Sequence, residues 1–208
     1  MSSARFPGKV LAPFRGRPIL AHVVERARAA VAPGRVFVVT SDLPSDDPVA
    51  AYAASAGIDV FRGPLDDVFE RFRQAALTSG ADWVLRVNAD SPVMSLRILR
   101  AVVDAADESC DLVSTIAPRT LPKGQNPEAV RVSMLEAAAA AALTPSDREH
   151  VTAWFYRHPE SCRIRNMSSG REGLAALNFS VDTVEDLARL ESLSEADLER
   201  LLPGTLHG

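Results

Sequence analysis

The sequence predicts an α/β domain built around a mostly parallel sheet. In the first half of the chain, short and continuously apolar runs alternate with amphipathic helical patterns, which indicates βαβ units. The chain has 208 residues, 47% of them apolar, so it is long enough for one domain with a full core. Right-handed crossovers place the loops after the strands on one edge, where open α/β sheets bind ligands.

Charge and cysteine content exclude several classes of protein. The net charge of −4 argues against a general nucleic-acid-binding protein, which usually carries a basic excess. The apolar runs are shorter than a membrane span, and the first residues lack the apolar run of a secretory signal. Cys110 and Cys162 stand alone rather than in metal-binding pairs. We therefore expect a reduced cytoplasmic protein that associates with neither membranes nor nucleic acid.

Each element of the first half has its own local signal. Pro18 suits the first turn of a helix, and Asp47 followed by Pro48 predicts another helix start. Gly57 and Gly80 suit helix ends, whereas the apolar runs suit buried strands. Helices are predicted over residues 17–31, 47–57 and 95–107, and a further helix is predicted from a cap at Asp66 or Asp67 to about Gly80. Strands are predicted over 36–39, 58–61, 83–87 and 112–116.

The second half has a different pattern. Residues 118–127 are rich in Pro, Gly, Lys and Asn and predict an exposed arm or hairpin, so that the whole arm covers about 117–132. Ser146 with Glu149 reads as a capping box that opens a helix as far as Tyr156. Ser133, Asp182 and Ser194 mark three further helix starts. Short strands are predicted over 128–132, 163–167 and 177–181, and residues 1–208 are interpreted as a single domain.

The opening segment, residues 2–11, has the composition of an anion-binding loop. Its small residues allow a ligand to approach the backbone, and Arg5 and Lys9 would neutralise phosphate charge. The positive end of the following helix would add to this field. The alternative is a frayed, solvated terminus, and neither a GxGxxG nor a GxxxxGK[ST] motif is present.

Two aspartates follow predicted strands at the ligand edge. Asp90 precedes a proline, and Asp182 precedes a helix. If both reach one edge, they form a two-carboxylate site for a hard divalent cation in phosphoryl or nucleotidyl transfer. The alternatives are a turn-forming role for Asp90 and a capping role for Asp182. Arg86 is unusual because it interrupts an apolar strand, where a buried arginine needs a partner.

An ordered set of motifs resembles the cytidylyltransferases that activate acidic sugars. The resemblance is to the family of the CMP-KDO and CMP-sialic acid synthetases, in its spore-coat polysaccharide cytidylyltransferase-like branch. The matching pieces span nearly the whole chain and are Ser2-Ser3-Ala4-Arg5-Phe6-Pro7-Gly8-Lys9-Val10-Leu11, Val38-Val39-Thr40-Ser41, Asp46-Asp47-Pro48, Val60-Phe61-Arg62-Gly63, Asp66-Asp67-Val68, Arg71-Phe72, Arg86-Val87-Asn88-Ala89-Asp90-Ser91-Pro92, Arg148-Glu149-His150-Val151-Thr152 and Val181-Asp182-Thr183-Val184-Glu185-Asp186-Leu187.

This resemblance implies a three-layer α/β/α, Rossmann-like nucleotide-diphospho-sugar transferase fold and a homodimer formed through the arm. It implies CTP and Mg²⁺, attack of an acceptor oxygen on the α-phosphorus, and loss of pyrophosphate. The implied catalytic residues are Arg5, Lys9 and Asp90, with Asp90 and Asp182 as metal ligands. The implied nucleotide-binding residues are Ser2, Ser3, Arg5, Lys9, Thr40, Ser41, Arg71 and Asn88. The implied acceptor-binding residues are Arg119, Glu128, Arg148 and His150.

The sequence departs from the family pattern in three places. The central strand that precedes the signature loop in the family is absent. We therefore expect either that the start site of this sequence is placed too late or that a rearrangement fills the position of the missing strand. The segment Gly124-Gln125-Asn126-Pro127-Glu128 replaces a Gly-x-Asp-x-Glu pattern, and Asn178 replaces a common arginine. The last two changes imply an unusual acceptor, such as a small phosphonate instead of a sugar acid. The competing hypotheses are a non-catalytic nucleotide- or partner-binding relative and a nucleotidyltransferase that uses another NTP.

Overall fold

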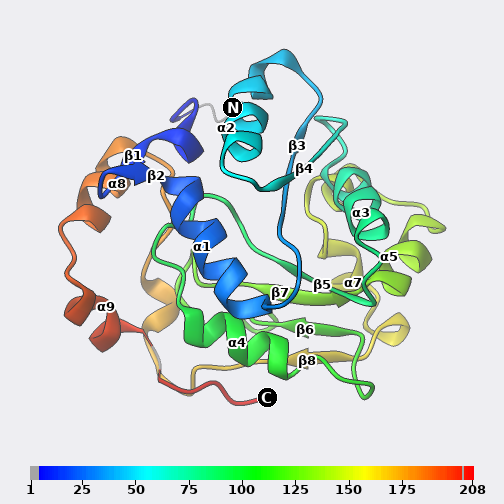
Figure 1. Cartoon of the computed structure of the whole chain (residues 1–208). Coiled ribbons are helices and arrows are strands. Elements are labelled where there is room, and N and C mark those ends of the chain that lie inside the picture. The colour runs from blue at the N-terminus through cyan, green and yellow to red at the C-terminus, as the bar shows by residue number, and fades with distance from the viewer. Residues whose placement is uncertain (1–4, 203) are drawn as a thin grey trace.

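A computed structural model describes residues 5–202 and 204–208 as a sheet layer between two layers of helices. Figure 1 shows α1 (Ile19–Val31) and α4 (Leu96–Asp104) on one side, and α3 (Val68–Ser79), α5 (Val132–Ala139) and α7 (Ala153–Arg157) on the other. Side chains alternate accordingly, because Val130 of the sheet packs with Phe155 of α7 whereas its neighbour Ala129 packs with Val102 of α4. The predicted three-layer α/β/α architecture is confirmed.

The strands form a pair and a four-stranded sheet. β3 (Phe37–Ser41) runs parallel to β4 (Asp59–Gly63). The larger sheet has the order β5 (Trp83–Arg86), β7 (Glu128–Arg131), β6 (Leu112–Ser114) and β8 (Ile164–Asn166). Because β7 is antiparallel to both neighbours and β6 is parallel to β8, β7 alone opposes the direction of the other three strands. The predicted mostly parallel sheet is therefore confirmed.

The remaining elements lie around these two sheets. A two-residue hairpin of β1 (Pro13–Phe14) and β2 (Arg17–Pro18) replaces the expected first helical turn, so α1 starts two residues later than predicted. The side chains of Asp67, Ser95, Thr183 and Ser194 cap helices by accepting a backbone N–H. The other helices are α2 (Asp47–Ser55), α6 (Pro145–Glu149), α8 (Val184–Glu191) and α9 (Glu195–Leu201). Within the described residues, no helix is long and apolar enough to cross a membrane.

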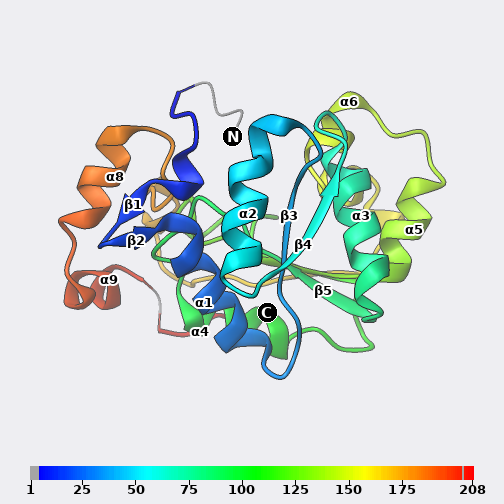
Figure 2. The same ribbon diagram turned by 45° about the horizontal axis from the view of Figure 1, so that its top comes forward.

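The sheet is broken between β3 and β5. In the described part of the chain, β3 is hydrogen-bonded only to β4 and β5 only to β7. Helices connect the two parts, since α1 packs against α4 and α3 packs against β3 (Figure 2). All four residues of β5 stay partly exposed, whereas β6 is fully buried. Among the described residues, the two sheets are therefore joined by helix packing rather than by a shared strand.

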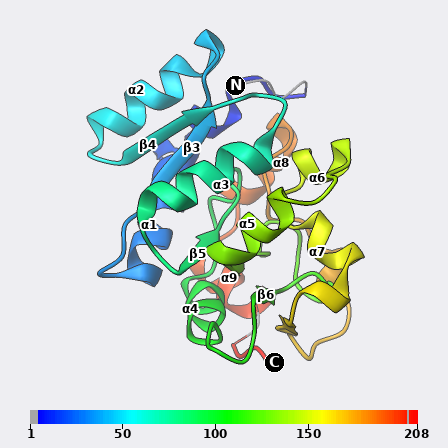
Figure 3. The same cartoon turned by 90° about the vertical axis from the view of Figure 1, so that its right-hand side faces the viewer.

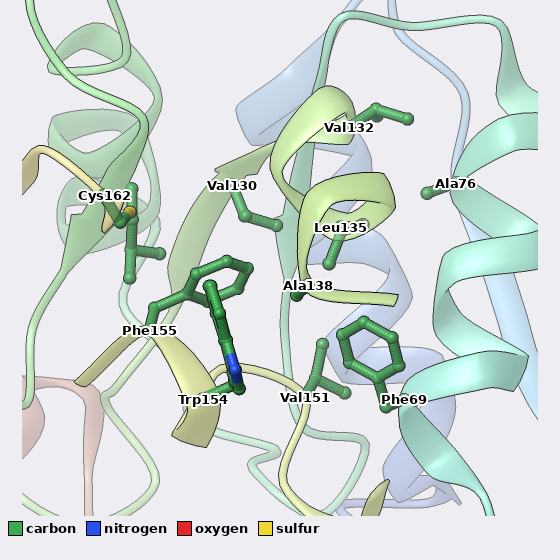
Figure 4. Packing of buried hydrophobic residues seen from close by; sticks show 11 residues of the cluster. Phe69, Ala76, Val130, Val132, Leu135, Ala138, Val151, Trp154, Phe155 and Cys162 are labelled. Carbon is green, nitrogen blue, oxygen red and sulfur yellow. The ribbon is translucent and has the colours of Figure 1, made fainter. Parts of the chain in front are cut away.

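The largest part of the core lies under α3, α5 and α7. Figure 4 shows Leu135 and Phe155 near Val130 of β7, and Phe69 of α3 belongs to the same cluster. Their side chains are at most 1% exposed. Since apolar burial contributes roughly 25 cal/mol per Å², this layer is a main source of stability. It fixes β7 in the sheet and therefore fixes the position of every residue that β7 carries.

Several local predictions were wrong. The capping box before α6 uses Thr144 and Asp147 instead of Ser146 and Glu149, and the expected long helix is divided into α6 and α7 (Figure 3). The helix expected to be capped by Ser133 begins two residues earlier, at Val132, with Arg131 in the cap position. Residues 177–181 form only an isolated bridge, between Lys123 and Asn178.

The predicted exposed arm is mostly folded into the molecule. Leu121 and Gln125 are completely buried, and β7 lies inside the sheet. The Gln125 amide accepts from the backbone of Ser95 and donates to the Val93 carbonyl, which ties this segment to the start of α4. Only the turn at 116–119 is exposed throughout. The segment therefore belongs to the body of the domain rather than projecting from it.

Candidate functional site

Three segments that are distant in sequence meet at the ammonium group of Lys9. Its Nζ donates to Asp90 Oδ2 at 2.7 Å and to Asp182 Oδ1 at 2.9 Å. Lys9 comes from the opening segment, Asp90 from the loop after β5, and Asp182 from the loop before α8. All three side chains are mostly buried, with 15%, 23% and 14% exposed, respectively. The structure thus places both predicted aspartates at one site, around a predicted cation.

Local packing holds the opening segment at this site. Residues Lys9–Leu11 form a 3₁₀ turn that begins after Gly8, whose φ of 74° suits glycine. The side chains of Val10 and Leu11 pack against a core cluster that contains Val38 of β3, and Ala89 packs against the same cluster. The described part of this segment is therefore folded against the domain rather than frayed. Its packing links β3 to the loop that carries Asp90, at the break between the two sheets.

The loops that carry the two aspartates are joined directly. The backbone N–H of Val181 donates to the carbonyl of Asp90 at 2.8 Å. Asp186 accepts from the backbone N–H groups of Asp182 and Thr183, and the Thr183 hydroxyl accepts from Asp186 in return, which completes a capping box. Capping is therefore performed by Thr183 and Asp186, so the Asp182 carboxylate is free to face Lys9.

Lys123 is a site residue that the sequence analysis did not identify. Its Nζ donates to Asp182 Oδ2, and Arg5 Nη2 lies 3.3 Å from the same oxygen. Asp182 is thus surrounded by three cations. We refer to Arg5, Lys9, Asp90, Lys123 and Asp182 as the aspartate–lysine cluster.

The cluster shifts the ionisation of its own members. Donation from Lys123, and then from Lys9, lowers the pKa of Asp182 from 3.8 to about 2, although burial opposes this shift. For Lys9, burial acts to lower the pKa, but the two carboxylates outweigh it and raise the pKa above its ordinary value. Both shifts favour the charged forms of Lys9 and Asp182 at neutral pH.

The predicted nucleotide-binding residues of β3 are engaged inside the protein. Thr40 and Ser41 are buried, and both hydroxyls donate to Asp46 Oδ2 at 2.7 Å. Burial acts to raise the pKa of Asp46, and hydrogen bonds from these hydroxyls and from the Ser41 N–H are among the interactions that lower it instead. The two residues lie at the carboxyl end of β3, so a contact of theirs with nucleotide remains a prediction.

The other predicted nucleotide-binding residues differ in placement. Arg71 on α3 donates to the carbonyl of Pro64 at 2.5 Å, while its buried Nε has no hydrogen-bond partner among the described residues. Burial lowers the pKa of Arg71. Asn88 is exposed in the loop that leads to Asp90. Ser2 and Ser3 lie outside the described residues.

Glu128 lies in a buried polar network. Its carboxylate, 1% exposed, accepts from Arg86 Nη1 at 3.0 Å, from the Thr152 hydroxyl at 2.9 Å and from the Tyr156 hydroxyl. The hydroxyls of Tyr156 and Ser114 are 2.8 Å apart. We refer to these five residues as the Glu128 network.

The Glu128 network explains the arginine in β5. Arg86 and Glu128 are opposite each other in the β5–β7 register, so the partner that a buried arginine needs is a strand neighbour. Burial and the Glu128 charge raise the pKa of Tyr156, which keeps its hydroxyl protonated as a donor. The Glu128 side chain is buried and pairs with Arg86, and a contact of Glu128 with an acceptor stays a prediction.

The remaining predicted acceptor residues are not brought into the cluster. Arg148 is half exposed and pairs with Asp67, the residue that caps α3. His150 is exposed at the end of α6. Arg119 is exposed in the turn at 116–119. Their proximity to an acceptor stays a prediction.

The donor set fits a hard divalent cation. Asp90 and Asp182 together enclose a space that already receives one cation, the Lys9 ammonium. No group of three or more His, Cys, Asp or Glu side chains suited to a metal occurs among the described residues. Two carboxylates, completed by phosphate oxygens and water, are the surroundings in which Mg²⁺ is usually bound.

Comparison with known proteins identifies relatives over almost the whole chain. The family model described as Cytidylyltransferase matches residues 1–201. The spore coat polysaccharide biosynthesis protein SpsF of Bacillus subtilis is 27% identical over 207 residues, covering 96% of this chain and 85% of SpsF. The 3-deoxy-manno-octulosonate cytidylyltransferase of Anaeromyxobacter dehalogenans is 31% identical over 231 residues, covering 93% of this chain and 94% of that protein.

Solved structures agree with this result. A cytidylyltransferase from Leptospira borgpetersenii superposes with a TM-score of 0.86 at 25% identity, covering 99% of this chain and 94% of that one. A CMP:2-keto-3-deoxy-manno-octonic acid synthetase complexed with CTP has a TM-score of 0.62 at 17% identity, covering 92% and 93%. Rv0371c from Mycobacterium tuberculosis, in complex with manganese, has a TM-score of 0.65 at 19% identity, covering 92% and 95%. The last two support the fold.

Proposed function

The chain belongs to the cytidylyltransferase family and is therefore a nucleotidyltransferase that moves CMP from CTP to an acceptor, and we propose that it does so with Mg²⁺ on a small anionic acceptor, releasing pyrophosphate. The observation that carries the proposal is the position of Lys9 between Asp90 and Asp182. A cation-binding pair of carboxylates beside a basic opening segment suits a triphosphate substrate.

Each member of the cluster has a role in this proposal. Asp90 and Asp182 hold the divalent cation, which supplies charge neutralisation on the phosphates when it is bound. Lys9 and Arg5 bind the triphosphate oxygens. Manganese in the complex of Rv0371c and the CTP bound to the octonic acid synthetase are properties of those proteins, and they support the choice of ligands tested below.

The reaction needs positioning and charge neutralisation more than a dedicated base. An acceptor oxygen forms a bond to the α-phosphorus while the bond from that phosphorus to the pyrophosphate oxygen breaks, and the bonding electron pair leaves with pyrophosphate. An acceptor oxygen that is already an anion has no proton to lose. A hydroxyl acceptor would release its proton to solvent. The acceptor class is a sugar acid or a small phosphonate, and the proposed assembly is a cytoplasmic homodimer.

The test is pyrophosphate release by the folded chain. We expect release with CTP, Mg²⁺ and at least one member of a panel of sugar acids and hydroxyalkylphosphonates, and loss of release when EDTA is added. Mn²⁺ should substitute for Mg²⁺. The panel should include ATP, GTP and UTP, because turnover with one of these in preference to CTP would contradict the proposed nucleotide.

Calorimetry distinguishes the enzyme from a non-catalytic relative. An intact site should bind CTP more tightly with Mg²⁺ than with EDTA, whereas a relative that has lost the site should show no metal dependence. Asp90→Asn should remove that dependence. Asp104→Asn, a change of an exposed aspartate at the end of α4, is the matched control and should preserve it. Metal-independent binding by the unmodified chain would count against the proposal.

A further inference from the structure

Lysine occurs at only two positions of this chain, and both donate to the same carboxylate. The sequence has 23 basic residues, of which Lys9 and Lys123 are the only lysines. Lys9 contacts Asp182 Oδ1, and Lys123 contacts Asp182 Oδ2. Arginine offers a rigid planar fork, whereas lysine offers a point charge on a flexible stem. A chain that otherwise uses arginine thus places its two mobile point charges at Asp182.

The backbone of Lys123 is fixed, while its side chain is free to move. Its N–H donates to the Leu177 carbonyl at 3.0 Å, and its carbonyl accepts from Phe179 N–H at 2.7 Å. The next residue, Gly124, has a φ of 83°, and a Cβ there would lie 2.5 Å from Ser180 N. The side chain of Lys123 is nevertheless 50% exposed. Its ammonium can therefore leave Asp182 without any change in the fold.

A divalent cation on the two aspartates would compete with both lysines for the same oxygens. Each ammonium displaced in this way would need another anion, because it would otherwise face a like charge across a few ångströms. Lys9 lies in the opening segment with Arg5, so the triphosphate would be the new anionic partner of its ammonium. Lys123 belongs to a different segment, the one that leads into β7. In-line displacement requires the acceptor and the leaving pyrophosphate to lie on opposite sides of the α-phosphorus.

Among the polar neighbours of Lys123, Asn178 is already engaged. Asn178 is the bridge partner of Lys123, and its amide oxygen accepts from the backbone N–H and the hydroxyl of Ser180. Its Nδ2 donates to Asp186 at 3.3 Å. Asn178 also carries no charge. Of the bridged residues Lys123 and Asn178, Lys123 is therefore the one whose charged side chain can bind an anionic ligand.

We propose that Lys123 binds the anionic group of the acceptor, and that it contacts Asp182 only while no metal is bound. This inference rests on the proposed function and deepens it by assigning a specificity residue and an acceptor chemistry. The ligand class is a small molecule that carries both a nucleophilic oxygen and an oxyanion. A carboxylate and a phosphonate share this chemistry, and a lysine binds either one through a single point of charge.

The kinetic test compares Lys123→Met with Lys123→Arg, using 3-deoxy-manno-octulosonate as the carboxylate and hydroxymethylphosphonate as the phosphonate. With whichever of these two acceptors the unmodified chain turns over, we expect Lys123→Met to raise the acceptor KM by about tenfold or more, because a charge-assisted contact is lost. The KM for CTP should stay within about threefold, because its triphosphate is held by other residues. Lys123→Arg should restore part of the loss. Arg171→Met, which removes another exposed cation, is the control.

A second readout does not depend on turnover. Reductive methylation with ¹³C-formaldehyde should give two lysine signals, since there are two lysines. Mg²⁺ alone should shift the Lys123 signal towards that of a free lysine, and the bound acceptor should shift it again. Mn²⁺ binding without nucleotide should tighten in Lys123→Met, because a competing cation has been removed.

The outcomes separate the two proposals. If the unmodified chain turns over an acceptor, while Lys123→Met keeps an acceptor KM within twofold, the role of Lys123 is contradicted and the proposed function stands. A Lys123 signal that does not respond to Mg²⁺ contradicts the exchange. If no acceptor is turned over and CTP binding does not depend on metal, both proposals are contradicted. A melting temperature close to that of the unmodified chain should accompany each variant, which shows that folding is not the cause.

Discussion

The aspartate–lysine cluster and the Glu128 network are both built around a carboxylate with several donors. They differ in whether those donors can leave the carboxylate without a change in the fold. Asp182 accepts from two flexible lysines and forms an ion pair with an exposed arginine. Glu128 accepts from Thr152 and Tyr156 of the packed α7 region and from Arg86 in the neighbouring strand. The first carboxylate can exchange partners without disturbing the fold, whereas the second cannot. Similar chemistry thus gives a binding site in one place and a rigid support in the other.

The largest expected effect is on the exchangeable side. Asp90→Asn should reduce kcat on the order of a thousandfold, because metal-assisted charge stabilisation contributes several kcal/mol to the transition state. The melting temperature should change little, because Asp90 is partly exposed and its partner Lys9 retains the ion pair with Asp182. Pyrophosphate release and thermal melts provide the two measurements. A near-normal rate would show that Asp90 does not hold the metal.

The Glu128 network should respond in the opposite way. Glu128→Ala should destabilise the protein by about 4 kcal/mol, because it leaves Arg86 without its partner in a mostly buried place. Tyr156→Phe should cost about 1 kcal/mol, since it removes one donor and keeps the ring. Urea unfolding provides the values. A small effect of Glu128→Ala on stability, together with a large loss of acceptor affinity, would instead support direct acceptor binding by Glu128.

A pair of glycine variants tests the fixed base of Lys123. Gly124 and Gly173 have φ values of 83° and 78°, so alanine at either position should cost about 1 kcal/mol in backbone strain. A Cβ at Gly124 would also meet the backbone of Phe179 at 2.5 Å, whereas at Gly173 nothing lies within 4 Å. Gly124→Ala should therefore cost about 3 kcal/mol, because overpacking adds to the strain. Equal costs in chemical denaturation would show that the close approach is unimportant.

The smallest expected effect is in acid titration. Asp182 has a pKa lowered to about 2, so its ion pairs contribute stability that is complete above its ordinary value of 3.8 and is lost as the pH falls towards 2. In Lys123→Met, the largest cause of the shift is removed, and Asp182 should begin to take up a proton at higher pH. A ¹³C carboxyl titration between pH 5 and pH 3 would show this. Superimposable curves would mean that Lys123 does not control Asp182.

The sequence predicted the architecture because its signals are local. The apolar runs and the capping residues Asp67, Ser95 and Ser194 act within a few residues, and these elements appear within one to three residues of the expected positions. The division of the helix after Glu149 could not be predicted from Ser146 and Glu149, since Thr144 with Asp147 makes an equally good capping box. The competition between two overlapping caps is settled by burial of Asp147, a property of the folded state.

The site was predictable only in part, because its contacts are long-range. Asp90 and Asp182 were found from their positions after strands, and the structure places them together. Lys123 was missed because it lies 59 residues from Asp182 and in a segment interpreted as an exposed arm. The scarcity of lysine could have marked it. The partner of Arg86 could not be named, since the β5–β7 register is set by packing across the sheet.

The break between β3 and β5 has a consequence for hydrogen exchange. Within the described residues, β6 and β7 are paired on both sides, whereas β3 and β5 each have one edge without a strand partner. Amide protons of β6 and β7 should therefore exchange only when the whole protein unfolds, while those on the free edges should exchange through smaller openings. Since the opening segment packs across that break, CTP and metal should slow the second group most. Binding would then be observed as slower amide exchange along the boundary between two units that unfold cooperatively.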